Sequence, residues 1–149
     1  MRYTLVIVDM QPQFIVKCIK ERSIIEANVL KQINKAIADN QPIIFLEFDK
    51  CGRSINRIIP KNYKQKTISK KSQQSGEQNI IRIINKKCWS KNIRVCGIFT
   101  SQCVKATVSD LTLNYNYKIS VIHNACADNE YDAEIVALNT MKLKGAKII

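Results

Sequence analysis

The chain has 149 residues, 46% of them hydrophobic, and a formal net charge of +12. This length and apolar content suffice for one domain with a buried core, which we expect to span residues 1–149. No run approaches the roughly 18 apolar residues of a membrane-spanning helix, so a membrane span is excluded. The first apolar run starts almost at Met1 and leaves no room for a signal peptide, which predicts a cytoplasmic location.

The charged residues and cysteines exclude further classes of function. The lysines are scattered, with mild clusters at 61–71 and 142–147, and no nucleic-acid-binding motif accompanies them. We interpret them as a solvated basic surface and do not expect specific nucleic-acid binding. Six cysteines without a CxxC pair indicate free thiols in a reducing compartment. The single histidine excludes a histidine-rich metal site.

Strand and helix patterns alternate along the chain, which predicts βαβ units and a mostly parallel sheet. The first strand is expected at residues 3–9. The sequence Ser-Ile-Ile-Glu at 23–26 matches a capping box, and apolar residues then recur at helical spacing up to residue 37. Residues 43–48 form a continuous apolar run, typical of a strand buried on both faces.

The remaining elements are expected to continue this alternation without a linker or a second domain. In chain order they are a loop (50–66), a short strand (67–71), a helix (80–88), a strand (94–99), a helix from residue 103, a strand (118–123), a helix (133–144) and a final strand (146–149).

Cys103 lies where an expected strand ends and a helix begins. A helix N-terminus favours negative charge, which predicts a lowered thiol pKa, and its N–H groups can hold an oxyanion. Asp9 ends the first strand, and chemistry in open α/β sheets sits at the carboxyl ends of strands. Taken alone, a single cysteine in an α/β protein is usually a small buried hydrophobe, and Asp9 could be a helix or loop cap. Together they suggest the nucleophile and base of a cysteine hydrolase.

Three segments resemble the isochorismatase-like cysteine hydrolases. Residues 8–14 (Val-Asp-Met-Gln-Pro-Gln-Phe) look like the opening motif of that family, and residues 97–104 (Gly-Ile-Phe-Thr-Ser-Gln-Cys-Val) look like its nucleophile segment. Residues 117–128 resemble the strand and turn that come next. The likeness runs along nearly the whole chain in the family's order. It implies a three-layer α/β/α fold with a six-stranded parallel sheet.

The resemblance also implies an Asp–Lys–Cys catalytic triad. Asp9 and Cys103 match the family's positions directly, whereas Lys70 and Lys71 are both candidates for the lysine. Lys71 is preferred because the small pair Ser-Gly at 75–76 follows it at the family's offsets.

Further site residues follow from the same resemblance. A cis peptide is expected just before Phe99, with the N–H groups of Phe99 and Cys103 forming an oxyanion hole. Gln11 and Phe14 are expected to line the substrate pocket. Glu77 stands where the family has phenylalanine.

The resemblance is to the metal-free branch of the superfamily. Nicotinamidases hold a metal through an aspartate and histidines after the second strand, but residues 46–51 (Leu-Glu-Phe-Asp-Lys-Cys) contain no histidine. We therefore expect no metal and no cofactor. The cysteine favours hydrolysis of a small amide or related C–N bond, through a thioester, over vinyl-ether cleavage. The family also implies a homo-oligomer, as a dimer or larger assembly.

Other functions remain open at this point. The chain is shorter than most family members, and Glu77 departs from the family pattern, which would suit a catalytically idle binding or scaffold protein. An isochorismatase-type vinyl-ether hydrolase and a basic nucleic-acid-associated domain are further alternatives. A dinucleotide-binding domain is disfavoured, because no G-x-G-x-x-G follows the first strand.

Overall fold

The structure is a computed structural model that describes residues 1–149. One sheet of six strands, all parallel, has the order β3-β2-β1-β4-β5-β6. The strands are β1 (Thr4–Val8), β2 (Ile43–Phe48), β3 (Lys66–Lys71), β4 (Asn92–Ile98), β5 (Lys118–Ala127) and β6 (Lys147–Ile148).

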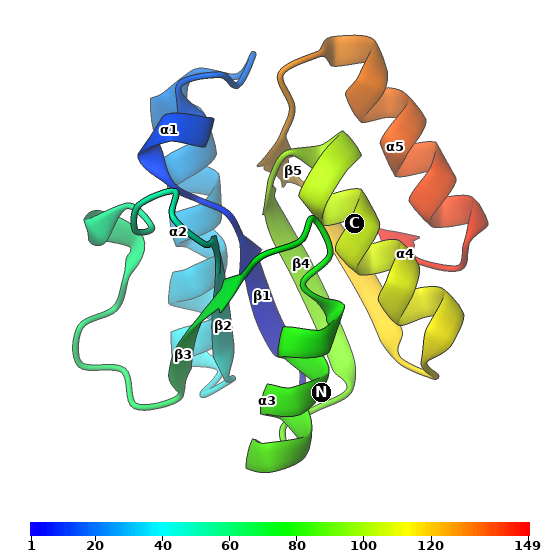
Figure 1. Ribbon diagram of the computed structural model, residues 1–149. Helices are drawn as coiled ribbons and strands as arrows, with labels where there is room; N and C mark the ends of the chain where they lie inside the picture. The colour runs from blue at the N-terminus through cyan, green and yellow to red at the C-terminus, as the bar shows by residue number, and fades with distance from the viewer.

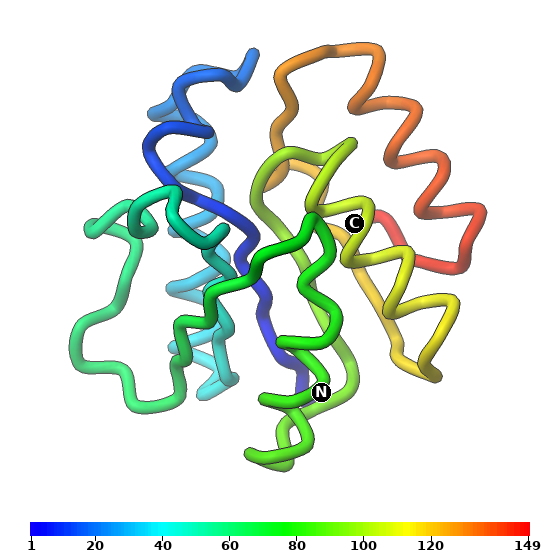
Figure 2. Tube along the Cα trace, in the orientation of Figure 1, coloured from blue at the N-terminus to red at the C-terminus, as the bar shows by residue number.

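Helices cover both faces of the sheet and make three layers. The helices are α1 (Pro12–Ile15), α2 (Arg22–Ala38), α3 (Glu77–Lys87), α4 (Lys105–Asn114) and α5 (Tyr131–Leu143). Figure 1 shows α2 behind the sheet, α3 and α4 in front of it, and α5 beside α4. The trace in Figure 2 shows the same layers without secondary structure. No helix is both long and apolar enough to cross a lipid bilayer.

Burial on both faces explains the composition of the central strands. All five residues of β1 are buried, as are the first five of β2, because helices pack above and below them. Such strands read as continuous apolar runs rather than as alternating ones. One cluster of 36 buried side chains runs through the sheet and both helical layers.

The chain reverses its winding between β1 and β4. These neighbouring strands pair in parallel, and β2 continues the sheet on one side while β5 continues it on the other. Ligand sites of open α/β sheets lie at such switch points, outside the carboxyl ends of the strands. Gly97 brings the two backbones together there, with φ +123°, since a Cβ at this position would collide with the Val8 backbone.

The three-layer fold with a six-stranded parallel sheet is confirmed, but two local predictions are wrong. The capping box does not form, because α2 begins at Arg22 and the Glu26 carboxylate instead pairs with Arg22 and Arg57. The fifth strand runs to Ala127 rather than to His123, past a shift of register opposite residues 95–97 of β4.

Candidate active site

Three strand ends bring Asp9, Lys71 and Cys103 to one place. Asp9 directly follows β1, Lys71 is the last residue of β3, and Cys103 lies in a π-helical turn, Thr100–Val104, after β4. Because all strands are parallel, their carboxyl ends share one edge of the sheet. Single π-helical turns of this kind are frequent at functional sites.

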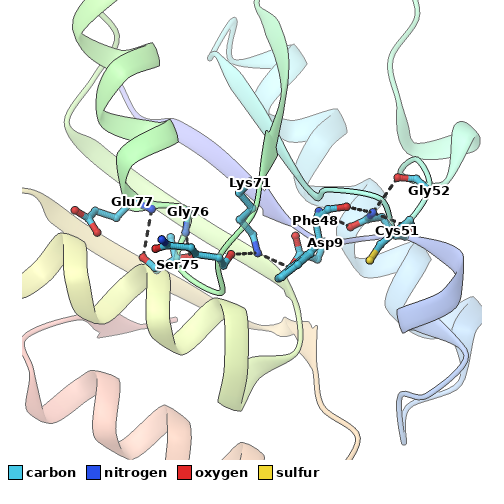
Figure 3. Close-up of polar contacts among 11 residues, drawn as sticks. Asp9, Phe48, Cys51, Gly52, Lys71, Ser75, Gly76 and Glu77 are labelled. Atoms are coloured by element: carbon cyan, nitrogen blue, oxygen red, sulfur yellow. Dashed lines mark hydrogen bonds and ion pairs between the residues drawn. The ribbon is translucent and has the colours of Figure 1, made fainter.

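Asp9 and Lys71 form a buried ion pair. The Lys71 Nζ lies 3.0 Å from Asp9 Oδ2, and the two side chains are 1% and 3% exposed. The ammonium also donates to the Gln73 carbonyl at 3.0 Å and lies 4.4 Å from the centroid of the Phe48 ring. Figure 3 shows the Lys71 side chain pointing toward Asp9. Lys70 is exposed, since successive residues of a strand point to opposite faces. The structure therefore brings Lys71, and not Lys70, to the aspartate.

The second oxygen of the Asp9 carboxylate is free. Asp9 Oδ1 is buried and has no hydrogen-bond partner. Burial raises the pKa of Asp9 above 3.8, against the opposing influence of Lys71 and of the Cys103 thiol beside it. A buried carboxylate oxygen without a donor retains the capacity to accept a proton.

The prediction of a lowered Cys103 pKa is wrong for the resting protein. Burial, followed by the nearby Asp9 charge, raises the pKa of Cys103 to about 12, and Lys71 offsets only part of this. Cys103 is 8% exposed, and desolvation of the thiolate outweighs the favourable field of a helix end. Burial beside Asp9 thus favours the neutral thiol over the thiolate.

The backbone before Cys103 has the predicted cis peptide, between Ile98 and Phe99. The Phe99 carbonyl accepts the N–H groups of Gln102 and Val104, which fixes the turn, while the Phe99 N–H has no backbone or side-chain acceptor. A backbone N–H without an acceptor within the protein is available to bind an oxyanion.

A carboxylate from a distant part of the chain caps this turn. Asp128 is 2% exposed. Its Oδ2 accepts the Ser101 N–H at 2.6 Å, and its Oδ1 accepts the N–H of Asn129. The Thr100 hydroxyl donates to Glu134 Oε1 at 3.2 Å, and Lys20 pairs with the same carboxylate at 3.5 Å. The cysteine turn is therefore anchored from β5 and α5.

A cavity of about 290 Å³ opens onto the thiol. Phe14 contacts Phe48 and Phe99 edge to face, with ring centroids 6.4 and 6.1 Å apart. No basic side chain lines the cavity, and most of its surface is apolar. The lining residues are Asp9, Phe14, Phe48, Cys51, Gln74, Ile98, Phe99, Gln102 and Cys103.

Phe14 lies in the cavity as expected, but Gln11 does not. Gln11 is fully buried, and its Oε1 accepts the Phe48 N–H while its Nε2 donates to the carbonyls of Phe48, Cys51 and Gly52. These bonds hold the loop after β2, and Phe48 and Cys51 of that region line the cavity. Gln11 thus acts on the site through this loop.

Several site residues were missed by the sequence reasoning. Cys51, Gln74 and Gln102 carry no pattern of their own, and only their place in the loops around the cavity identifies them. Asp128 had a weak signal, since it ends the segment that resembles the family's turn. Glu77, by contrast, lies outside the cavity lining, and its carboxylate accepts the Tyr115 hydroxyl at 3.3 Å.

The fold and the site together define a doubly wound α/β protein with a cysteine, an aspartate and a lysine at its switch point. The sequence model of the isochorismatase domain matches residues 3–149. The chain therefore belongs to the isochorismatase family. A comparison with curated proteins found no match.

Solved structures share the fold at low sequence identity. The nicotinamidase SaPncA from Staphylococcus aureus has 21% identity and a TM-score of 0.87, over 99% of this chain and 97% of that one. The pyrazinamidase of Pyrococcus horikoshii, in complex with zinc, has 20% identity and a TM-score of 0.81, and the match covers 100% of this chain and 99% of that one. The MAR1 ribonuclease from Caenorhabditis elegans has 21% identity and a TM-score of 0.87, and the match covers 98% of this chain and 75% of that one.

The residues at the end of β2 do not fit a metal ion. Glu47 is buried and accepts the Ser54 N–H at 2.6 Å, and Asp49 accepts the Lys50 N–H at 3.0 Å. The chain has no group of three or more histidine, cysteine, aspartate and glutamate side chains placed to share a metal. Zinc sites need three or four such ligands.

Proposed function

We propose that this protein is a cysteine hydrolase that cleaves a small, neutral amide through a thioester on Cys103, with Asp9 and Lys71 completing the triad. One observation supports this function above the others. The Asp9 carboxylate is buried, its Oδ2 binds Lys71, its Oδ1 has no partner, and the Cys103 thiol lies near enough to influence its pKa.

The reaction begins with proton transfer, because the resting thiol is neutral. Asp9 Oδ1 takes the Cys103 proton as the sulfur attacks the substrate carbonyl carbon. The carbonyl π electrons move to oxygen, and the N–H groups of Phe99 and Cys103 bind the resulting oxyanion. Lys71 holds the carboxylate in place and offsets the negative charge that is shared between carboxylate and sulfur.

The tetrahedral intermediate then collapses. Asp9 returns the proton to the leaving nitrogen, the C–N bond breaks, and ammonia or an amine departs from a thioester. A water molecule gives its proton to Asp9 and adds to the thioester carbonyl. The C–S bond breaks, the proton returns to sulfur, and the carboxylic acid leaves. Asp9 thus acts alternately as base and acid.

The cavity lining supports a neutral, flat acyl group as the substrate. Three phenylalanine rings and Ile98 supply apolar walls, and Lys71, the nearest cation, is occupied by Asp9. An anionic substrate would therefore find no free counter-charge. The amides of Gln74 and Gln102 can bond a polar ring atom or the carboxamide itself.

We expect the purified protein to release ammonia from neutral aromatic carboxamides, with nicotinamide and pyrazinamide as first probes. The corresponding acids, which carry a charge, should bind far more weakly. Ammonia release should persist in EDTA, because the end of β2 offers no metal ligand set. Coupled ammonia detection across a panel of aromatic and aliphatic amides measures this. Failure to hydrolyse any amide, combined with tight binding in thermal-shift assays, would instead support a catalytically idle binding protein.

Asp128 should affect the position of the nucleophile. Asp128→Ala removes the Ser101 anchor and is expected to lower kcat by about 10- to 100-fold, with a smaller change in KM. Asp128→Asn keeps a carbonyl acceptor and should restore most of the rate. The rate of iodoacetamide labelling of Cys103, relative to that of Cys51 in the same cavity, should also change in Asp128→Ala. This ratio reports the displacement of Cys103 without a substrate. Equal kcat and equal labelling ratios in all three proteins would contradict this role.

A further inference from the structure

The positive charge of the chain is concentrated in one segment. Residues 50–71 contain eight of the 24 lysines and arginines and none of the 12 acidic residues, so they hold most of the net charge of +12. This segment is the connection from β2 to β3 together with β3 itself, which is one of the two edge strands of the sheet. Figures 1 and 2 show the connection and β3 along one side of the molecule.

Most of these cations are exposed and have no acidic partner. Five of them are exposed and take part in no ion pair: Lys50, Arg53, Lys61, Lys64 and Lys70. Arg57 pairs with Glu26, and Lys71 belongs to the active site. Asp49, half-buried just before the segment, accepts the backbone N–H of Lys50. We call the five unpaired residues the basic edge.

The basic edge borders a surface hollow that also has apolar atoms. The hollow, about 390 Å³, is lined by Lys61, Asn62, Tyr63, Lys64, Lys66 and Ile68. Lys66 donates to the carbonyls of Lys61 and Tyr63, which fixes the base of the hollow, and Ile68 is 47% exposed. Cations around an aromatic and an aliphatic side chain suit a ligand that alternates phosphates with flat bases.

We propose that the basic edge binds single-stranded nucleic acid through its phosphates, without sequence specificity and at a site separate from the Cys103 cavity. A membrane surface fits less well, because the edge is a strand and an irregular connection, with Ile68 its only largely exposed hydrophobic side chain. None of the residues that define the basic edge lines the Cys103 cavity.

Two variants of equal charge test this site. Lys61→Gln/Lys64→Gln/Lys70→Gln removes three charges from the basic edge, and Lys142→Gln/Lys144→Gln/Lys147→Gln removes three exposed charges near the C-terminus. Fluorescence anisotropy with labelled oligouridylate, over a series of salt concentrations, measures affinity. The first variant should bind at least about 10-fold more weakly at low salt, with a salt slope smaller by about 2. The second should remain within about twofold of wild type.

Each other outcome overturns the proposal. Equal weakening in both variants would mean that the attraction is diffuse, and absence of binding by the wild-type protein at low salt would mean that there is none. Polyglutamate or anionic phosphatidylserine vesicles displacing the oligonucleotide at equal charge concentration would assign the edge to another polyanion. Cys103→Ala should bind the oligonucleotide like wild type, so failure of the proposed hydrolase activity leaves this test intact.

Discussion

Replacing Cys103 with alanine should reduce kcat/KM for any amide substrate by on the order of 10⁴ or more, because no other group in the cavity can form the thioester. The fold should survive, since the lost sulfur costs about 1 kcal/mol or less of unfolding free energy. Cys51→Ala is the matched control, as its thiol lines the same cavity and has no role in the proposed chemistry.

Acid quenching during turnover, followed by peptide mass spectrometry, should find the acyl group on the peptide that contains Cys103. Undiminished turnover by Cys103→Ala, or an acyl group on Cys51, would contradict the scheme.

The pH dependence of the same reaction follows from the buried carboxylate. Asp9 must be ionised to accept the thiol proton, and burial raises its pKa above 3.8. The acid limb of kcat/KM should therefore lie at higher pH than for an ordinary aspartate. Cys103, with a pKa of about 12, stays protonated through the neutral range, so ionisation of the thiol produces no alkaline limb there. Asp9→Asn should abolish turnover at every pH.

The sequence was sufficient to predict the sheet and the meeting of its strand ends. Continuous apolar runs identify β1 and β2, because strands covered on both faces are mostly nonpolar along their length. Parallel strands place their carboxyl ends together, so Asp9 and Cys103 could be paired from their positions alone. The choice of Lys71 over Lys70 required the family resemblance as well. Adjacent residues of a strand point to opposite faces, but the sequence does not show which face of β3 meets the site.

The electrostatics of the site could not be predicted from position. Desolvation opposes the effect of a helix N-terminus on a thiol pKa, and the sequence does not reveal that Cys103 is buried near Asp9. The hydrogen bond between Asp128 and Ser101 could not be predicted either, because 27 residues separate the two along the chain. Gln11 follows the family motif, but its four hydrogen bonds depend on the backbone path of a loop some 40 residues later.

Replacing Lys71 with methionine should reduce both activity and stability. The change removes the partner of a carboxylate that is 3% exposed, and breaking a buried pair in this way costs about 3–5 kcal/mol. Without Lys71 the pKa of Asp9 rises further, so the carboxylate binds a proton. Protonation relieves part of the cost in stability but removes the base at neutral pH. Lys70→Met, an exposed neighbour on the same strand, should leave the free energy of unfolding and kcat nearly unchanged.

A double-mutant cycle separates the two effects of Lys71. Asp9→Asn/Lys71→Met leaves no unpaired charge in the site, so its free energy of unfolding, from urea denaturation, should exceed that of Lys71→Met alone. Its activity should stay absent, because the base is gone. Additive losses of stability would show that the two side chains are uncoupled. Recovery of stability without recovery of turnover identifies the ion pair as a device that keeps a buried carboxylate ionised beside Cys103, at the expense of the stability that an apolar pair would provide.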